Sequence, residues 1–158
     1  ELVELQALLV PSQYGTPTRV VTGLDSKRVA QLGAILESRG GLQLVGQDTY
    51  VKVAGGLRLT DPAVDLGLTL SMASSLRERP LPVDLIAIGE VGLTGELRPV
   101  VQLEARLEEA RAHGFARAIV GLHESRKSPK VRGMQIVGVR SVREAVQAAF
   151  EGAKGATG

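Results

Sequence analysis

The feature that most constrains this chain is a glycine-rich corner that follows a short apolar run. Leu85–Ile88 is uniformly apolar, which is typical of a buried strand, and residues 89–100 then read Gly-Glu-Val-Gly-Leu-Thr-Gly-Glu-Leu-Arg-Pro-Val. Because glycine adopts backbone conformations that other residues avoid, this spacing predicts a tight connection into a second short strand at 97–100. Residues 102–113 follow with a helical pattern. A strand, a sharp turn, a strand and a helix are therefore expected in this order.

The composition indicates one domain with an aliphatic core. The chain has 158 residues, of which 44% are hydrophobic but only 3% aromatic, so Val, Leu, Ile and Ala must fill the core. The absence of cysteine excludes a disulfide framework and a thiolate zinc site, and it fits a reducing cytoplasm. No apolar run has transmembrane length, so no membrane partner is expected. The formal charge of +2 is weak support for a nucleic-acid partner by itself.

Hydrophobic periodicity predicts a chain that begins with strands and continues with alternating strands and helices. Asp25 or Ser26 is placed to cap the first helix, and Asp61 with Pro62 is placed to open the second. The second helix is apolar on most sides, which is typical of a central element. This order favours the α+β class, or an α/β-like arrangement with a mixed sheet. The expected strands are residues 1–10, 18–22, 50–54, 57–59, 85–88, 97–100, 118–120 and 135–139, and the expected helices are 27–39, 62–77, 102–113 and 142–150.

The ends of the chain are expected to differ from its body. Residues 1–150 are predicted to form one domain, and residues 151–158, most of which are small, are predicted to be a disordered tail. The first residue is Glu1 rather than Met, which suggests an excised C-terminal fragment of a longer protein.

The corner segment resembles a known family. Its Gly-Glu-x-x-Leu-x-Gly pattern, which begins at Gly89, is similar to that of the proteolytic domain of Lon-type proteases. The fuller form of the motif resembles the Lon-like C-terminal domain of the RadA (Sms) family of bacterial DNA-repair proteins; it comprises Gly92, Glu96, Arg98 and Glu104-Ala105-Arg106. The resemblance covers residues 2–150 and implies the Lon proteolytic-domain fold, which is shared with a domain of a small-subunit ribosomal protein.

The resemblance also implies that the residues of peptide hydrolysis are replaced. In Lon-type proteases a serine at the start of the central helix is deprotonated by a lysine on the helix after the corner, since a hydroxyl nucleophile needs an adjacent base. The serine position corresponds to Asp65, the lysine position to Glu104, and a threonine of the corner motif to Gly92. We therefore expect a non-catalytic domain with no catalytic residue of its own.

Two interpretations remain open for the replaced positions. If Asp65 and Glu104 were close, they would form a pair of carboxylates of the kind that performs acid–base chemistry in glycosidases. Alternatively, Asp65 stabilises the N-terminus of its helix through the helix dipole, and Glu104 pairs with a basic residue. We favour the second interpretation, because two acidic residues far apart in sequence are common by chance.

A rearranged serine–lysine peptidase is the alternative from a different functional class. The central helix also carries Ser71, Ser74 and Ser75, but hydroxyl groups on helices usually bond to helix carbonyl groups. No lysine occurs between Lys52 and Lys127, so these two residues are the first candidates for the base. The sequence offers no closer pairing.

No metal or nucleotide site is predicted in this chain. Its two histidines, His113 and His123, are too few for a metal cluster, and no Walker-type glycine–lysine loop is present. By the resemblance, ATP, Mg and Zn are the cofactors of a zinc finger and a RecA-like ATPase part that would precede this domain.

Basic residues provide the remaining candidate surface. In residues 126–132 four of seven residues are basic and none is acidic, and proline and serine predict a loop. Mobile positive groups suit phosphate contacts, although such loops are also common without a ligand. No aromatic platform for base stacking is evident, so DNA contact would be electrostatic and independent of sequence. The candidate DNA-binding residues are Arg126, Lys127, Lys130 and Arg132, and on predicted strands Lys52 and Arg58.

Together these features predict a non-catalytic Lon-like scaffold domain of a RecA-like, ATP-driven DNA-repair protein in the cytoplasm. The resemblance implies a homohexameric ring, contact with the ATPase domain of the same chain, and binding of DNA, single-stranded by preference, in recombination and repair. A pure oligomerisation module without DNA contact is the remaining alternative.

Overall fold

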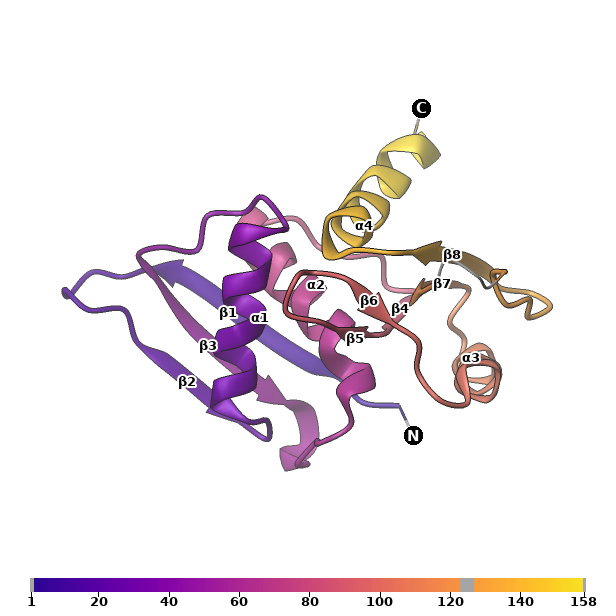
Figure 1. Ribbon diagram of the computed structural model, residues 1–158, viewed down its shortest axis with the longest axis horizontal. Helices are drawn as coiled ribbons and strands as arrows, with labels where there is room; N and C mark the ends of the chain where they lie inside the picture. Colours follow the sequence, from indigo (N-terminus) through magenta and orange to yellow (C-terminus); the bar gives the residue numbers. More distant parts are fainter. Residues whose placement is uncertain (1, 123–126, 158) are drawn as a thin grey trace.

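The computed structural model describes residues 2–122 and 127–157, with side chains through Phe150, and it has a mixed α+β architecture (Figure 1). The described strands form two three-stranded sheets, in the orders β1-β3-β2 and β4-β7-β8, and one β5-β6 hairpin. The strands are β1 (Leu5–Pro11), β2 (Arg19–Thr22), β3 (Gln47–Val53), β4 (Leu85–Ile88), β5 (Glu90–Val91), β6 (Leu97–Arg98), β7 (Arg117–Gly121) and β8 (Gln135–Val139). The helices are α1 (Ser26–Ser38), α2 (Asp65–Arg77), α3 (Leu103–Ala112) and α4 (Val142–Thr157), with 3-10 turns η1 (Ala54–Gly56) and η2 (Pro62–Val64).

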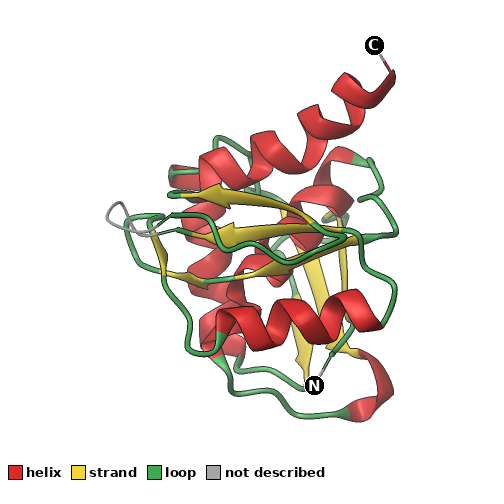
Figure 2. Cartoon of the chain, turned by 90° about the vertical axis from the view of Figure 1, so that its right-hand side faces the viewer, coloured by secondary structure: helices red, strands yellow, loops and turns green. Residues whose placement is uncertain are grey.

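The second sheet is parallel and covered on both faces. The central strand β7 pairs in parallel with β4 and with β8, and Figure 2 shows this sheet lying between α4 and α3. Ile119 faces the main core, whereas Ala118 and Val120 pack in a second cluster with Leu107 of α3. Burial of both faces explains why β7 is apolar and buried from Ala118 to Gly121 rather than alternating.

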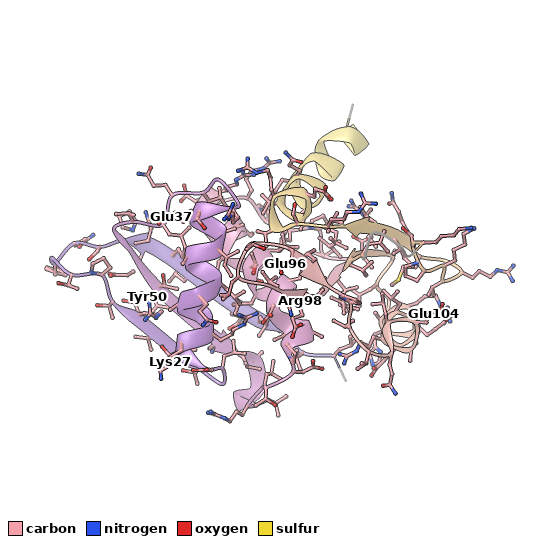
Figure 3. All side chains as sticks on the ribbon, viewed as in Figure 1. Lys27, Glu37, Tyr50, Glu96, Arg98 and Glu104 are labelled. Atoms are coloured by element: carbon pink, nitrogen blue, oxygen red, sulfur yellow. The ribbon has the colours of Figure 1, made fainter. Side chains whose placement is uncertain are left out.

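The first sheet is mixed and alternates along its strands. β1 is antiparallel to β3, and β2 is parallel to β3. On β3, Val51 and Val53 are buried while Tyr50 and Lys52 are exposed, as expected for a sheet with one face on the core. Figure 3 shows Tyr50 on this sheet. The inner face packs against α1, which is capped by Asp25, since its carboxylate accepts the N–H of Lys27 at 3.0 Å.

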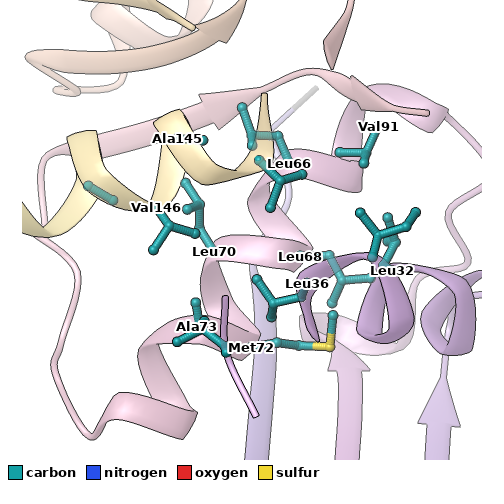
Figure 4. Packing of buried hydrophobic residues seen from close by; sticks show 14 of the residues in the cluster. Leu32, Leu36, Leu66, Leu68, Leu70, Met72, Ala73, Val91, Ala145 and Val146 are labelled. Atoms are coloured by element: carbon teal, nitrogen blue, oxygen red, sulfur yellow. The ribbon is translucent and has the colours of Figure 1, made fainter. Parts of the chain in front are cut away.

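Helix α2 is the centre of the molecule, as its sequence predicted. Its apolar residues fill the space between α1 and α4 (Figure 4), and most of them are buried. The opening turn η2 is capped by Asp61, whose carboxylate accepts the N–H of Ala63 at 2.9 Å. The buried residues of α2 are Asp65, Leu66, Leu68, Thr69, Leu70, Met72 and Ala73.

The α+β class is confirmed, but several predicted element boundaries are wrong. β1 begins at Leu5 rather than Glu1, and β6 ends at Arg98 because Pro99 has no N–H to donate to a partner strand. Residues 57–59 are not a strand, since Gly55 and Gly56, both at positive φ, turn the chain out of register with the sheet.

The C-terminal boundary also differs from the prediction. The last helix was expected to end at Phe150, and α4 continues to Thr157. The division into a domain and a tail stays a prediction, as does the finer Lon-type fold. Among the described helices, none has both the length and the apolar character needed to cross a membrane.

Candidate functional site

A cavity of about 560 Å³ opens where α1, α2 and the β5-β6 hairpin meet. It contains Asp65, at the position that the sequence matched to a protease serine. The extended segment at 58–62 forms another wall. No serine and no lysine is among the described residues that line it. The polar residues that line it are Asp25, Arg28, Arg58, Thr60, Asp61, Asp65, Glu90 and Arg98.

The Asp65 carboxylate is buried and forms an ion pair with Arg28. Its side chain is 3% exposed, against 29% for Arg28. The Arg28 guanidinium donates from Nε to Oδ1 at 3.2 Å and from Nη2 to Oδ2. This bidentate arrangement is the strongest geometry for such a pair, and it raises the pKa of Arg28, chiefly through the hydrogen bond to Asp65.

The same two side chains also hold strand β5. The N–H of Val91 donates to Oδ2 of Asp65 at 3.1 Å, and Arg28 Nη2 donates to the carbonyl of Val91 at 2.6 Å. The pair therefore joins α1, α2 and β5 at one point. Every polar atom of the buried carboxylate has a partner, so Asp65 stabilises the structure here.

Gly92 leaves room for the carboxylate of Glu96. A Cβ on Gly92 would lie 2.2 Å from Oε1 of Glu96. That carboxylate accepts the hydroxyl of Thr94 at 2.7 Å and its N–H at 3.1 Å, and these bonds, the hydroxyl first, lower the pKa of Glu96. The Glu96 carboxylate thus fills the space beside Gly92 and binds Thr94 within the same corner. The glycine spacing alone did not predict this contact.

Glu104 does not join this site. It is exposed on the first turn of α3, and it is not among the residues that line the cavity around Asp65. Figure 3 shows it on the α3 side of the molecule, away from Glu96 and Arg98. The hypothesis of a carboxylate pair is therefore wrong.

The favoured interpretation of these two positions needs correction as well. For Glu104 it stays a prediction, since no ion pair joins that carboxylate to another described residue. It is incomplete for Asp65, which lies in the first turn of α2 but is also bound by Arg28.

The serines of α2 are committed to structural hydrogen bonds. Ser71 Oγ donates to the carbonyl of Gly67 at 2.8 Å, as predicted for a helix hydroxyl. Ser75 Oγ accepts the N–H of Leu9 at 2.9 Å, and Ser74 Oγ donates to the carbonyl of Arg79 at 2.5 Å. Ser71 lines a second cavity, of about 590 Å³, that no described lysine lines.

Histidine and carboxylate side chains do not assemble into a metal site in the part of the chain that is described. No group of three or more potential ligands occurs there. His113 is exposed, and its Nδ1 lies 2.9 Å from the carbonyl oxygen of Glu109. His123 lies outside the described residues.

The candidate DNA-binding residues fall on two separate parts of the fold. Lys127, Lys130 and Arg132 are exposed between β7 and β8; Arg126 lies outside the described residues. Lys52 is exposed on β3 in the other sheet, and Arg58 is exposed beside the cavity of Asp65. Figure 1 shows β3 and the β7-β8 connection toward opposite ends of the molecule, so these residues do not form one surface.

Arg111 lies beside the basic connection, the segment between β7 and β8 that carries Lys127, Lys130 and Arg132. No sequence pattern indicated this proximity. A Cβ on Gly133 would lie 3.6 Å from Cδ of Arg111, which brings the last turn of α3 against the end of the connection. The Arg111 guanidinium contacts Glu108 at 3.4 Å, and both side chains are about half exposed. An arginine on the polar face of a helix carries no local signal of a tertiary neighbour, so only the fold reveals it.

The fold and this site define a small mixed α+β domain whose cavity contains an ion pair with a buried carboxylate. No protein-family model matches the chain. It is 49% identical over 146 residues to the DNA repair protein RadA of Escherichia coli K12, which covers 92% of this chain and 31% of that protein. It is 47% identical over 152 residues to RadA of Bacillus subtilis 168 (96% and 33%) and 46% identical over 150 residues to RadA of Pseudomonas aeruginosa PAO1 (95% and 33%).

The chain therefore belongs to the RadA family of DNA repair proteins. It spans about a third of the length of the curated relatives that it matches, and it corresponds to their C-terminal part.

Proposed function

We propose that this chain is a non-catalytic, Lon-like scaffold domain of a RadA-type DNA-repair protein, which supports a hexameric ring and binds DNA without sequence preference. The observation that carries the non-catalytic part is the Asp65–Arg28 ion pair. A serine protease needs a free hydroxyl beside a base at this position. Here the carboxylate is buried, fully hydrogen-bonded and essential to the joint between α1, α2 and β5.

The first expected result is the absence of peptidase activity. The chain should release no fluorescence from labelled casein above a buffer blank, because the serines on α2 bond to backbone groups and no described lysine lies in the cavity of Ser71. A Lon-type protease assayed beside it serves as the positive control. Cleavage that is lost in Ser71→Ala or Lys127→Ala would favour the peptidase instead.

The DNA-binding part of the proposal is supported by charge and exposure. Lys130 and Arg132 are exposed and follow one another closely, and Arg111 adds a cation from a second element. Exposed cations on a connection between strands suit phosphate oxygens, which need positive groups rather than shaped pockets. We therefore favour this basic connection over the Lys52 and Arg58 positions, which stand apart from other candidate cations.

Charge reversal in the basic connection should weaken DNA binding and flatten its dependence on salt. For a Lys130→Glu/Arg132→Glu variant, the slope of log K against log salt should fall by roughly 0.7 for each lost contact with single-stranded DNA. A salt titration of fluorescent oligothymidine measures this. Lys27→Glu is the matched control, since Lys27 is also exposed but lies at the other end of the molecule (Figure 3).

An unchanged slope would contradict the proposed surface and move the contact to Lys52 or Arg58. Light scattering in the same buffers reports the oligomeric mass. A ring that binds no DNA at any salt concentration would leave the third function, a pure oligomerisation module. In the whole protein we propose that this domain works in the cytoplasm beside a RecA-like ATPase part, where ATP, Mg and Zn bind.

A further inference from the structure

The outer face of the first sheet is open and partly apolar. The residues that alternate with the buried ones on its strands include Leu8 on β1, Val20 on β2 and Tyr50 on β3, which are 52%, 48% and 39% exposed. Leu8 and Val20 are both register partners of Tyr50. The three side chains therefore form one apolar row across the whole width of the sheet. Apolar groups gathered on one open face usually mark a partner surface.

Charges of opposite sign lie on either side of this row. Asp48 and Lys52 are two residues before and after Tyr50 on the central strand, and side chains two apart on a strand share a face. Their register partners on β1 are Val10 and Gln6, which are uncharged. The face thus carries one anion and one cation, placed symmetrically about the apolar row.

We propose that this face binds the same face of a second copy of the chain about a two-fold axis. With the two central strands antiparallel across the interface, each Lys52 lies over the Asp48 of the other copy, and the two apolar rows meet on the axis. Such self-complementarity is what an isologous contact requires, and open sheets commonly pack face to face at about 10 Å. This contact does not involve the basic connection, which lies toward the other end of the molecule (Figure 1).

The composition of the face favours a protein partner over DNA. A phosphate-binding surface gathers several cations, whereas here Lys52 is balanced by Asp48. A three-stranded face is small, below the roughly 1,200 Å² that stable complexes usually bury. We therefore expect a weak dimer that becomes strong only where several copies are already held together.

Charge exchange at positions 48 and 52 tests the two-fold geometry in the 158-residue chain. Sedimentation equilibrium over a hundredfold range of concentration should show association that Lys52→Asp weakens at least tenfold, because it places acids over acids. The double variant Asp48→Lys/Lys52→Asp should restore it. Asp48 also accepts the N–H of Thr18 at 2.7 Å, so thermal melting of each variant separates a loss of folding from a loss of association.

Tyr50→Asp places a carboxylate from each copy at the two-fold axis and should abolish the association. Val83→Asp is the control and should not affect it, since Val83 is 98% exposed and lies on neither sheet. If the chain also forms a ring, Tyr50→Asp should halve the largest mass and leave the ring intact. Three outcomes overturn the inference: no association in the native chain beyond a ring, association unaffected by Tyr50→Asp, or a double variant no better than Lys52→Asp. Weaker oligothymidine binding by Tyr50→Asp, without a change in mass, would instead assign the face to single-stranded DNA.

Discussion

Replacing Asp65 with alanine should lower the free energy of unfolding by about 3 kcal/mol, the lower end of the range for breaking a buried ion pair by removing one partner. The change leaves the Arg28 guanidinium without its bidentate acceptor and the N–H of Val91 without a partner. The lower end applies because Arg28 is 29% exposed, so water can solvate part of its charge. Urea denaturation followed by circular dichroism measures the loss.

An exposed pair in the same corner gives the matched control. Glu96 and Arg98 contact each other at 3.4 Å and are 42% and 58% exposed, so breaking that ion pair through Arg98→Ala should cost less than about 1 kcal/mol. The double change Asp65→Leu/Arg28→Met should recover much of the lost stability, since an apolar pair carries no desolvation penalty. If Asp65→Ala and Arg98→Ala proved equally mild, the buried pair would not be the joint described above.

Gly23→Ala should be nearly as damaging, with a loss of about 3 kcal/mol. Gly23 has φ of +85°, and a Cβ there would lie 2.4 Å from the carbonyl oxygen of Leu57 and 2.8 Å from Cγ2 of Val53. The backbone oxygen cannot yield without displacing the segment at 57–59, which is tied to Gly23 by the N–H of Leu59 at 2.8 Å. Thermal and urea denaturation measure the change.

The variant Gly15→Ala is the control that distinguishes the steric clash at Gly23 from the strain of a positive φ. It has φ of +82°, but a Cβ added there would have nothing within 4 Å, so Gly15→Ala should show only the strain, about 1 kcal/mol. Equal losses at the two positions would mean that the crowding at Gly23 relaxes freely. A much larger loss at Gly23 would show that the segment carrying Arg58 is held rigidly beside the cavity.

Elements whose signal is local were predictable from the sequence. The apolar helix α2, the Asp61-Pro62 opening and the glycine corner all have a cause within a few residues, and the structure confirms them. The segment at 57–59 was mistaken for a strand because it alternates in polarity. Alternation describes side chains, whereas pairing depends on where the two preceding glycines turn the backbone.

The candidate site was less predictable because its contacts join distant parts of the chain. Asp65 was singled out from the sequence, but its ion-pair partner Arg28 is 37 positions away and lies on a helix whose sequence gives no reason to prefer it. Likewise, nothing near Arg111 indicates that the basic connection lies beside it. Pairings of this kind follow from packing, and only the assembled fold specifies them.

The central position of α2 has a consequence for synthesis of the protein on the ribosome. Residues of α4, among them Val146 and Phe150, pack in the same core cluster as Leu9 of the first strand. Because α4 is made after every other described element, that cluster stays open while the first sheet and α2 are already available to fold. The nascent domain therefore exposes apolar surface until translation has passed α4.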